Sequence, residues 1–372
     1  RPCRTGRMAE QGRGGVRKSR FGDRNYTASG WFADDQNRRQ EEAELSEVRL
    51  PEGLDEFLDA AGWPGAQVEP LAGDASFRRY FRVRNGDGQT AMLMDAPPPH
   101  EDPRPFLHVA KYLLANGFRA PAIYGEDLIR GLILIEDFGD ERMREHLDAH
   151  PEDESAIYRQ AIDTLVALEK APVADVALYD AAAYLRETAL FAEWYMPAVG
   201  LAVDKTEFDA LWGRALAPLF DKKWQQVTVL RDYHAENIML LSDGAQGIID
   251  FQDALAGHPA YDLVSLLQDA RRDVSPELEA KMLAYYRDNA KPDADFDLHY
   301  ALLGAQRNAK IIGIFTRLWK RDGKERYLGF LPRMWALLER DLAHPGLVEL
   351  RDWFDTNIPQ EVRAQSPLDR AF

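Results

Sequence analysis

The sequence predicts an α+β protein with two lobes: a small antiparallel β-sheet N-lobe that carries one helix, and a larger, mainly helical C-lobe. Three observations predict this class. Turn residues and strand-like segments dominate residues 49–137, apolar residues at helical spacing dominate residues 138–372, and a hairpin pattern interrupts the helices at residues 238–250. The chain has 372 residues, of which 45% are hydrophobic, so it can bury a sizeable core.

The first elements of the N-lobe are a helix and a pair of strands. The apolar residues of the helix recur at helical spacing, and Gly62 and Pro64 end it. These apolar residues are Leu54, Phe57, Leu58 and Ala61. Strands are expected at residues 77–83 and 91–94, because residues 85–88 read Asn-Gly-Asp-Gly, which is typical of a tight turn.

A second helix and a second pair of strands complete the N-lobe. Residues 102–116 place apolar side chains on one helical face, and Gly117 is typical of a helix end. Strands are expected around residues 123–124 and 132–135. This order suits a small antiparallel sheet, and we place the boundary between the lobes after residue 137.

The pattern is helical from residue 153 onward. Three apolar stripes recur at helical spacing. They consist of Ile157, Ala161, Leu165 and Leu168; of Tyr184, Leu185, Thr188, Phe191 and Tyr195; and of Phe208, Leu211, Trp212, Leu216 and Leu219. Three or four more helices are expected between the hairpin and about residue 343.

Residues 1–48 are predicted to form a disordered basic extension. Residues 1–40 hold ten Lys and Arg against four Asp and Glu, a net charge of +6, and show no sustained apolar period. Arg-rich tails can also act as targeting or RNA-binding arms. The net charge of the whole chain is −16, so the remaining residues carry −22. Such an acidic body argues against nucleic acid as a partner, since phosphate backbones need a cationic surface.

Cysteine content and apolar run length restrict the class of protein further. Cys3 is the only cysteine, which excludes a disulfide framework and fits a reducing cytoplasm. The apolar runs, such as residues 132–135, are far shorter than the roughly 18 residues of a membrane span. We find no secretion signal. These observations favour a cytoplasmic protein without a membrane partner, and we expect a monomer.

The segment that ends in the hairpin carries the strongest functional signal. Asp232 lies in a loop, Asn237 immediately precedes the first hairpin strand, and Asp250 follows the second. An antiparallel hairpin returns its second strand to the level where its first began, so Asn237 and Asp250 are expected side by side. Any one of these residues alone would most often be a turn former or a helix cap.

Phosphoryl transfer by kinases uses this combination of side chains. One carboxylate accepts the hydroxyl proton, while an amide and a second carboxylate hold Mg²⁺ on the phosphates of ATP. The pattern therefore predicts a small-molecule kinase that uses ATP and Mg²⁺. In this interpretation Asp232 is the catalytic base, and Asn237 and Asp250 are the metal ligands.

The segment 231–250 resembles the superfamily of aminoglycoside phosphotransferases and choline kinases, which has a protein-kinase-like fold. Further segments are similar to the anomeric amino-sugar kinases of bacterial cell-wall recycling. These segments are residues 71–82, 93–98, 135–139, 250–254, 261–265 and 306–332, and the resemblance covers roughly residues 50–345. It implies phosphorylation of the 1-hydroxyl of N-acetylmuramate or N-acetylglucosamine with ATP, in peptidoglycan recycling.

The expected phosphate-binding turn is Gly73-Asp-Ala-Ser76, whose small residues let backbone N–H groups approach phosphate oxygens. We include Gly73, Ser76 and Phe77 among the nucleotide-binding residues. Kinases of this fold place a Lys on the next strand, but Met94 occupies that position here.

Three arginines on the preceding strand are candidates to replace the missing lysine. Alternation along a strand puts Arg78 and Arg82 on one face and Arg79 on the other. The sequence alone leaves the choice open, and we assign Arg79 to the nucleotide site.

Residues 132–139 predict a buried strand that runs into the connection between the lobes. Backbone groups near Glu136 are expected to pair with adenine, and Phe138 or Ile135 to pack on the ring. The carboxylates of Glu136 and Asp137 can equally cap the next segment.

Residues around the catalytic motif complete the expected site. The resemblance implies that His234 supports the catalytic loop, and we also count it among the substrate candidates. Asp262 is expected to brace the loop by hydrogen bonds. Gln252 and Asp253 follow Asp250 and either face the acceptor or cap the segment.

A basic stripe follows in the C-lobe. Residues 301–327 hold seven basic residues against two acidic ones, a net charge of +5. Arg307, Lys310, Arg317 and Arg321 lie along one face of a helix. This face is either solvated or recognises an anion such as the lactyl carboxylate of N-acetylmuramate, with Arg307 as the substrate contact.

Two alternatives remain open. One is a kinase of the same fold that acts on another small alcohol, such as an aminoglycoside, choline or homoserine. The other is a non-catalytic nucleotide-binding protein, because the strand lysine is absent and Leu230 stands where catalytic loops often have His.

Overall fold

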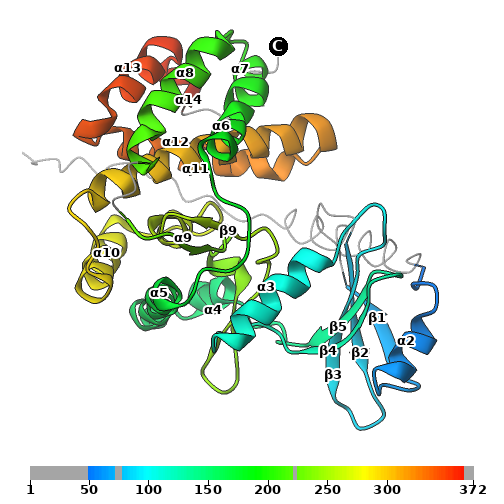
Figure 1. Ribbon diagram of the computed structural model, residues 1–372. Helices are drawn as coiled ribbons and strands as arrows, with labels where there is room; N and C mark the ends of the chain where they lie inside the picture. The colour runs from blue at the N-terminus through cyan, green and yellow to red at the C-terminus, as the bar shows by residue number, and fades with distance from the viewer. Residues whose placement is uncertain (1–48, 72–77, 221–223, 364–372) are drawn as a thin grey trace, which may run out of the picture. The chain divides into compact units, whose positions relative to one another are not determined.

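The computed structural model describes residues 49–71, 78–220 and 224–363 (Figure 1). The disordered extension expected over residues 1–48 lies outside the described residues, as does the segment 72–77.

The N-terminal part is a five-stranded antiparallel sheet with strand order β1-β2-β3-β5-β4. Its strands are β1 (Gln67–Pro70), β2 (Arg79–Arg84), β3 (Thr90–Asp95), β4 (Ile123–Asp127) and β5 (Leu132–Glu136). Helices α2 (Leu54–Ala60) and α3 (Arg104–Ala115) accompany it, and Figure 1 shows them on opposite sides of the sheet. Both predicted strand pairs and both helices are confirmed. Strand β1 was missed, because its four residues, Gln-Val-Glu-Pro, include no buried position and only one β-branched side chain, Val68.

The two faces of the sheet differ in what they contact. Met94 of β3 belongs to the large core cluster that also contains Phe106 of α3, so this face packs towards α3. Tyr80 of β2 lies opposite Met94 and shares this face. Phe81 and Leu93 point to the other face and are fully buried.

The remaining chain is mainly helical, as predicted. Its helices of eight or more residues are α5 (Glu154–Lys170), α6 (Ala181–Leu190), α8 (Lys205–Leu216), α9 (Ala260–Leu267), α10 (Pro276–Ala290), α11 (Phe296–Asp322), α12 (Leu331–Leu342) and α13 (Val348–Asn357). Shorter segments are α4 (Met143–Ala149), the π-helix η2 (Phe191–Tyr195), α7 (Met196–Ala198) and α14 (Gln360–Arg363). The helices thus continue past residue 343, where the prediction ended.

Local sequence explains several helix ends. Asp180, Asp204 and Ser275 accept backbone N–H bonds at the starts of α6, α8 and α10. Gly323, with φ of 68°, ends α11 in the left-handed conformation that glycine adopts without strain.

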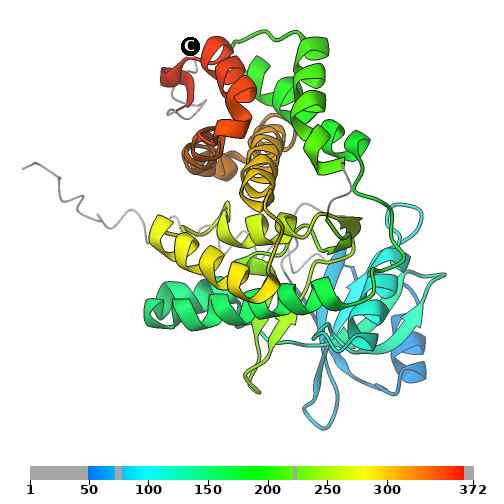
Figure 2. The same cartoon turned by 60° about the vertical axis from the view of Figure 1, so that its left-hand side comes forward.

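Helix α11 is the central element of this part. Its contacts include α6, η2, α9 and α12. Figure 2 shows α5 and α10 running side by side, in agreement with their contacts.

Two short strand pairs lie among the helices. Strand β7 (Ile238–Leu240) pairs with β8 (Gln246–Ile248), and this is the predicted hairpin. Strand β6 (Val227–Val229) pairs with β9 (Leu255–Gly257). The second pair was missed, because strands of three residues are too short to show alternation. In the described part of the chain, no helix combines the length and the apolar character needed to cross a membrane.

Candidate active site

The hairpin brings Asn237 and Asp250 together as predicted. Ile238 pairs with Ile248, and the backbone N–H of Ile249 donates to the carbonyl of Asn237 at 3.1 Å. The Asn237 amide then donates from Nδ2 to Asp250 Oδ2 at 3.3 Å. A side-chain amide and a carboxylate thus stand next to each other at the open end of the hairpin.

Asp232 joins this pair through its backbone. Its carbonyl accepts a hydrogen bond of 2.9 Å from Asn237 Nδ2. Arg231 and Asp250 both have positive φ, 72° and 59°, which is uncommon for residues other than glycine. Such strain at a loop residue is held only where the surrounding structure enforces it.

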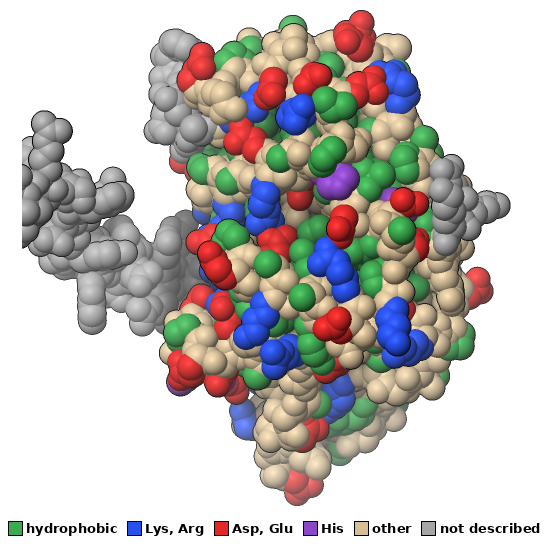
Figure 3. Space-filling view, turned by 90° about the vertical axis from the view of Figure 1, so that its left-hand side faces the viewer, with side chains coloured by type: hydrophobic (Ala, Val, Ile, Leu, Met, Phe, Trp, Pro, Cys, Tyr) green, Lys and Arg blue, Asp and Glu red, His purple; other side chains and the backbone are tan. Residues whose placement is uncertain are grey.

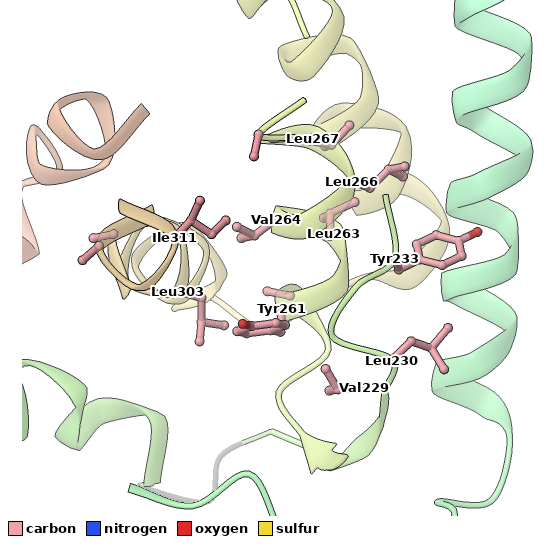
Figure 4. Packing of buried hydrophobic residues seen from close by; sticks show 14 of the residues in the cluster. Val229, Leu230, Tyr233, Tyr261, Leu263, Val264, Leu266, Leu267, Leu303 and Ile311 are labelled. Carbon is pink, nitrogen blue, oxygen red and sulfur yellow. The ribbon is translucent and has the colours of Figure 1, made fainter. Parts of the chain in front are cut away.

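Asp262, at the start of α9, enforces the conformation of this loop. Its two carboxylate oxygens accept the backbone N–H groups of Leu230 at 2.6 Å and of Arg231 at 2.8 Å. The predicted brace is therefore confirmed. Figure 4 shows α9 beside the loop, with Tyr233 on the side of α5, where its hydroxyl donates to Ala161 at 3.0 Å.

The two carboxylates of the site differ in their electrostatics. Burial raises the pKa of Asp232, but the nearby charges of Lys310, His234 and Arg307 outweigh it, so the pKa lies below the usual value. Asp232 is thus favoured in its ionised form. The pKa of Asp250 is raised by burial and by Asp232, although its hydrogen bond from Gln252 opposes the shift.

These donors fit a hard cation. Asn237 and Asp250 offer oxygen ligands, which Mg²⁺ prefers, and a cation beside Asp250 would relieve the cost of its partly desolvated charge. Among the described residues no group of three or more His, Cys, Asp or Glu side chains forms a metal site. The fit therefore depends on this Asn–Asp pair.

His234 contacts the catalytic loop rather than open solvent. It is buried, and its Nε2 accepts from Arg271 at 3.3 Å and lies 3.5 Å from Asn237 Nδ2. The other ring nitrogen, Nδ1, has no hydrogen-bond partner among the described residues. These contacts are those of a supporting residue.

The residues after Asp250 separate into two roles. Gln252 donates from Nε2 to Asp250 Oδ1 at 2.7 Å and so orients the carboxylate. The Asp253 side chain is exposed, while its carbonyl accepts a long hydrogen bond of 3.4 Å from Arg231.

Part of the expected phosphate site lies outside the described residues, namely Gly73, Ser76 and Phe77. Arg79 is described, and it forms a close ion pair with Asp95 across β3. Its guanidinium also lies 5.7 Å from the ring centroid of Phe81, on the sheet face opposite Tyr80 and Met94. The structure does not bring Arg79 together with Asp250, because strand alternation turns it away.

The connection between the lobes is well defined. Glu136 forms an ion pair with Arg119 and accepts the backbone N–H of Ala122 at 3.2 Å. The Arg119 guanidinium lies 4.8 Å from the centroid of the Phe138 ring. A Cβ on Gly247 would approach that ring to 2.6 Å, so Phe138 packs tightly against the hairpin. These contacts fix both side chains, whose expected role towards adenine stays a prediction.

The basic stripe of α11 is solvated only at its end. Arg321 is exposed, whereas Arg307 is buried and donates to Ser265 Oγ at 2.8 Å. Lys310 is nearly buried and lies close enough to Asp232 to influence its pKa. The anion-recognition interpretation therefore applies at most to the first half of the stripe.

Glu187, in α6, organises this region and was not among the predicted site residues. Four side chains donate to its carboxylate. They are Tyr179, Arg231, Gln306 at 3.1 Å and Lys310 at 3.0 Å. Glu187 is far from Asp232 in sequence and lies at a half-buried helical position, so no local pattern marks it.

Unpartnered polar atoms accumulate around this network. Within the described residues, several side chains close to Glu187 or Asp232 carry a buried nitrogen or oxygen atom without a hydrogen-bond partner. They include Tyr184 OH, Arg231 Nε, Gln306 Oε1 and Arg307 Nη1. Buried polar groups are rarely left unsatisfied, so these atoms are places where ordered water or another polar group would add hydrogen bonds.

Comparisons with known proteins agree with this geometry. Residues 67–297 match the model of the phosphotransferase enzyme family. The chain is 38% identical to an N-acetylmuramate/N-acetylglucosamine kinase of Caulobacter vibrioides, over 82% of this chain and 96% of that protein. It is 40% identical to a kinase of the same name from Pseudomonas aeruginosa, over 84% and 95% of the two chains.

Solved structures show the same fold at low sequence identity. The choline kinase LicA from Streptococcus pneumoniae matches with a TM-score of 0.57 at 13% identity, covering 79% of this chain and 97% of that one. The ADP-bound aminoglycoside phosphotransferase APH(2'')-Ib matches with a TM-score of 0.52 at 15% identity, covering 73% and 92%. The predicted bilobal, protein-kinase-like fold is thereby confirmed.

Proposed function

The chain belongs to the phosphotransferase enzyme family, and from this membership we propose that it is an ATP-dependent kinase of an amino sugar. The proposed reaction transfers the γ-phosphoryl group of ATP to the anomeric 1-hydroxyl of N-acetylmuramate or N-acetylglucosamine. The names of the relatives, which share 36–40% of their residues with this chain, support this acceptor.

The observation that carries the proposal is the joined set of Asp232, Asn237 and Asp250. Hydrogen bonds of 2.9 and 3.3 Å from one amide hold the three residues together. A protein that only binds nucleotide has no need of a base, an amide and a second carboxylate in this arrangement. Leu230 does not weaken the proposal, since its backbone is held by Asp262 whatever its side chain.

We assign the reacting hydroxyl to Asp232. The lowered pKa keeps this carboxylate ionised, so that it can orient the hydroxyl and accept its proton. We assign Mg²⁺ to Asn237 and Asp250, where its charge would neutralise phosphate oxygens. Catalysis in this scheme consists mainly of positioning and charge neutralisation.

The charges beside Asp232 favour a neutral or acidic acceptor. Lys310, Arg231 and Arg307 lie on this side, and Glu187 is bonded to the first two. A polycationic aminoglycoside would meet these cations at close range, whereas a sugar with hydroxyl and amide groups can bond the unpartnered polar atoms.

Nucleotide, cellular location and oligomeric state complete the proposal. We propose that adenine binds beside residues 135–138 and that the enzyme is cytoplasmic, where ATP is available. We also propose that it is a monomer. On the face in Figure 3 acidic and basic side chains are interspersed, which favours small ligands over nucleic acid as partners.

The test is ATP consumption against N-acetylmuramate, N-acetylglucosamine, kanamycin and choline, with NMR to locate the new phosphate. We expect turnover of an amino sugar and phosphate on its 1-hydroxyl. Asp232→Asn is the control, and we expect it to bind ADP but lose turnover. Turnover of only kanamycin or choline would contradict the proposed acceptor. ADP binding without turnover of any acceptor would favour a non-catalytic protein.

A further inference from the structure

The position that a strand lysine would occupy is closed by apolar packing. Met94 is completely buried, and the Tyr80 hydroxyl, from the paired residue of β2, lies 3.6 Å from its sulfur. This face packs towards α3 and the core cluster. The cation that binds nucleotide phosphates must therefore come from another element.

Arg78 lies next to this position, because it bonds the same Tyr80 hydroxyl that contacts Met94. It precedes β2, and the Tyr80 hydroxyl accepts a hydrogen bond from it. Its Nε donates to Glu101 Oε2 at 3.1 Å, and the two side chains are only 12% and 19% exposed. An arginine and a glutamate thus form a nearly buried pair over the end of the Tyr80 side chain.

This pair is on the side of the proposed metal ligand Asp250. Phe106 of α3, shortly after Glu101 in the chain, stacks on Phe251 with ring centroids 5.1 Å apart. Burial raises the pKa of Tyr80, and Asp250 lies close enough to add to the shift while Arg78 opposes it. Arg78 and Asp250 are therefore both close enough to the Tyr80 hydroxyl to act on it electrostatically.

The other two candidate arginines are committed elsewhere. Arg79 pairs with Asp95 on the opposite face of the sheet. Arg82 pairs with Asp137 at 2.8 Å and with Asp140 at 2.8 Å, at the connection between the lobes.

We propose that Arg78, held in place by Glu101, binds the α- and β-phosphates of the nucleotide in place of the strand lysine. This inference rests on the proposed ATP-dependent function. A guanidinium has five N–H donors in a planar fork, so it can hold Glu101 and phosphate oxygens at the same time. Glu101 is in this view a positioning residue.

The test compares the binding of ADP and of adenosine by isothermal titration calorimetry, in Arg78→Gln and in its matched control Arg79→Gln. Loss of charged hydrogen bonds to phosphate should weaken ADP binding by about 10- to 100-fold in Arg78→Gln. Adenosine lacks phosphates, so its binding should not change. Arg79→Gln should bind both ligands as the unaltered protein does.

Two further variants separate the charge of Arg78 from its geometry and from its support by Glu101. Arg78→Lys keeps the charge but loses the fork, and its ADP affinity should fall between those of Arg78→Gln and the unaltered protein. It also serves if Arg78→Gln fails to fold. Glu101→Gln should raise KM for ATP at an unchanged KM for the sugar.

Unchanged ADP affinity in Arg78→Gln, or equal losses for ADP and adenosine, would overturn the inference. These outcomes are separate from failure of the proposed function. An unaltered protein that binds ADP but phosphorylates no amino sugar would contradict the function, while the ADP-to-adenosine comparison would still test Arg78.

Discussion

Glu187 gives the catalytic loop an anchor that is remote in sequence. It bonds Arg231, the residue before Asp232, and also Lys310, whose charge helps to lower the pKa of Asp232. Burial raises the pKa of Glu187, but Lys310 and Arg231 outweigh it, so the pKa is lowered and the group stays ionised. One carboxylate therefore holds both cations next to the proposed base.

We expect Glu187→Gln to lower kcat/KM for the sugar while ADP binding is retained. The variant keeps the shape of the side chain but loses charged hydrogen bonds to Arg231 and Lys310. We therefore expect kcat/KM for the sugar to fall about 10- to 100-fold. Steady-state kinetics with varied sugar, together with calorimetry of ADP binding, measure the two effects. The matched control is Glu193→Gln, since Glu193 pairs with Lys205 at 3.1 Å where both side chains are about half exposed. If Glu187→Gln were as active as the control, the proposed role of Glu187 beside the acceptor site would be contradicted.

At the scale of elements, helix α11 determines how the C-lobe side chains reach the site. It carries Gln306, Arg307 and Lys310, and it crosses the junction of α6 and η2 closely. Gly313 makes this crossing possible. A Cβ at this position would lie 2.6 Å from both the carbonyl oxygen of Leu190 and the amide nitrogen of Phe191. Backbone atoms cannot move away as a flexible side chain can, so the contact requires glycine.

Gly313→Ala should therefore destabilise the protein by about 1–3 kcal/mol, the usual cost of overpacking. Gly213, inside α8, offers the opposite case, because a Cβ there would meet nothing within 4 Å. Gly213→Ala should stabilise by about 0.5–1 kcal/mol, since alanine loses less backbone entropy in a helix. Urea unfolding of both variants measures the two free energies. Equal effects of the same sign would contradict this account of the α6–α11 crossing.

At the scale of the whole molecule, a buried histidine pair couples stability to pH. His258 follows β9 and accepts the N–H of Ala260 on Nδ1 at 3.1 Å, so its proton is on Nε2, which lies 3.0 Å from His299 Nδ1 in α11. Burial, and then His299, lower the pKa of His258 from 6.5 to about 3. Between pH 6.5 and about pH 3, His258 therefore binds a proton in the unfolded chain but not in the folded protein.

Stability should accordingly fall as the pH drops below 6.5, by about 1.4 kcal/mol per pH unit for this one proton. The contribution of His258 is fully present above pH 6.5 and is lost towards pH 3. His258→Asn keeps an acceptor for Ala260 but cannot titrate, so its free energy of unfolding should change less between pH 7 and pH 5. His150→Asn, at an exposed position, is the control and should follow the unaltered protein. Identical slopes in His258→Asn and in the control would contradict the assignment.

The sequence by itself determined most of the longer elements and the core of the proposed site. Helices, strand pairs and the hairpin follow from periodicity and turn residues, which act over a few positions. Asn237 and Asp250 could be placed together for the same reason, since a single hairpin connects them, and Asp232 lies in the short loop that leads into that hairpin. The relation of Asp262 to the loop was also expected and is confirmed by two hydrogen bonds.

Only the tertiary structure decided which charges stand around that core. Alternation separated Arg79 from Arg78 and Arg82, but which face of the sheet packs towards α3 depends on contacts between distant segments. Glu187 meets Arg231 across 44 positions and Lys310 across 123, separations at which no local pattern can act. The sequence pattern of the basic stripe on α11 is the same whether the stripe faces water or packs against another helix. Burial against α6 and α9 turned its first half towards Asp232 and left its end in solvent.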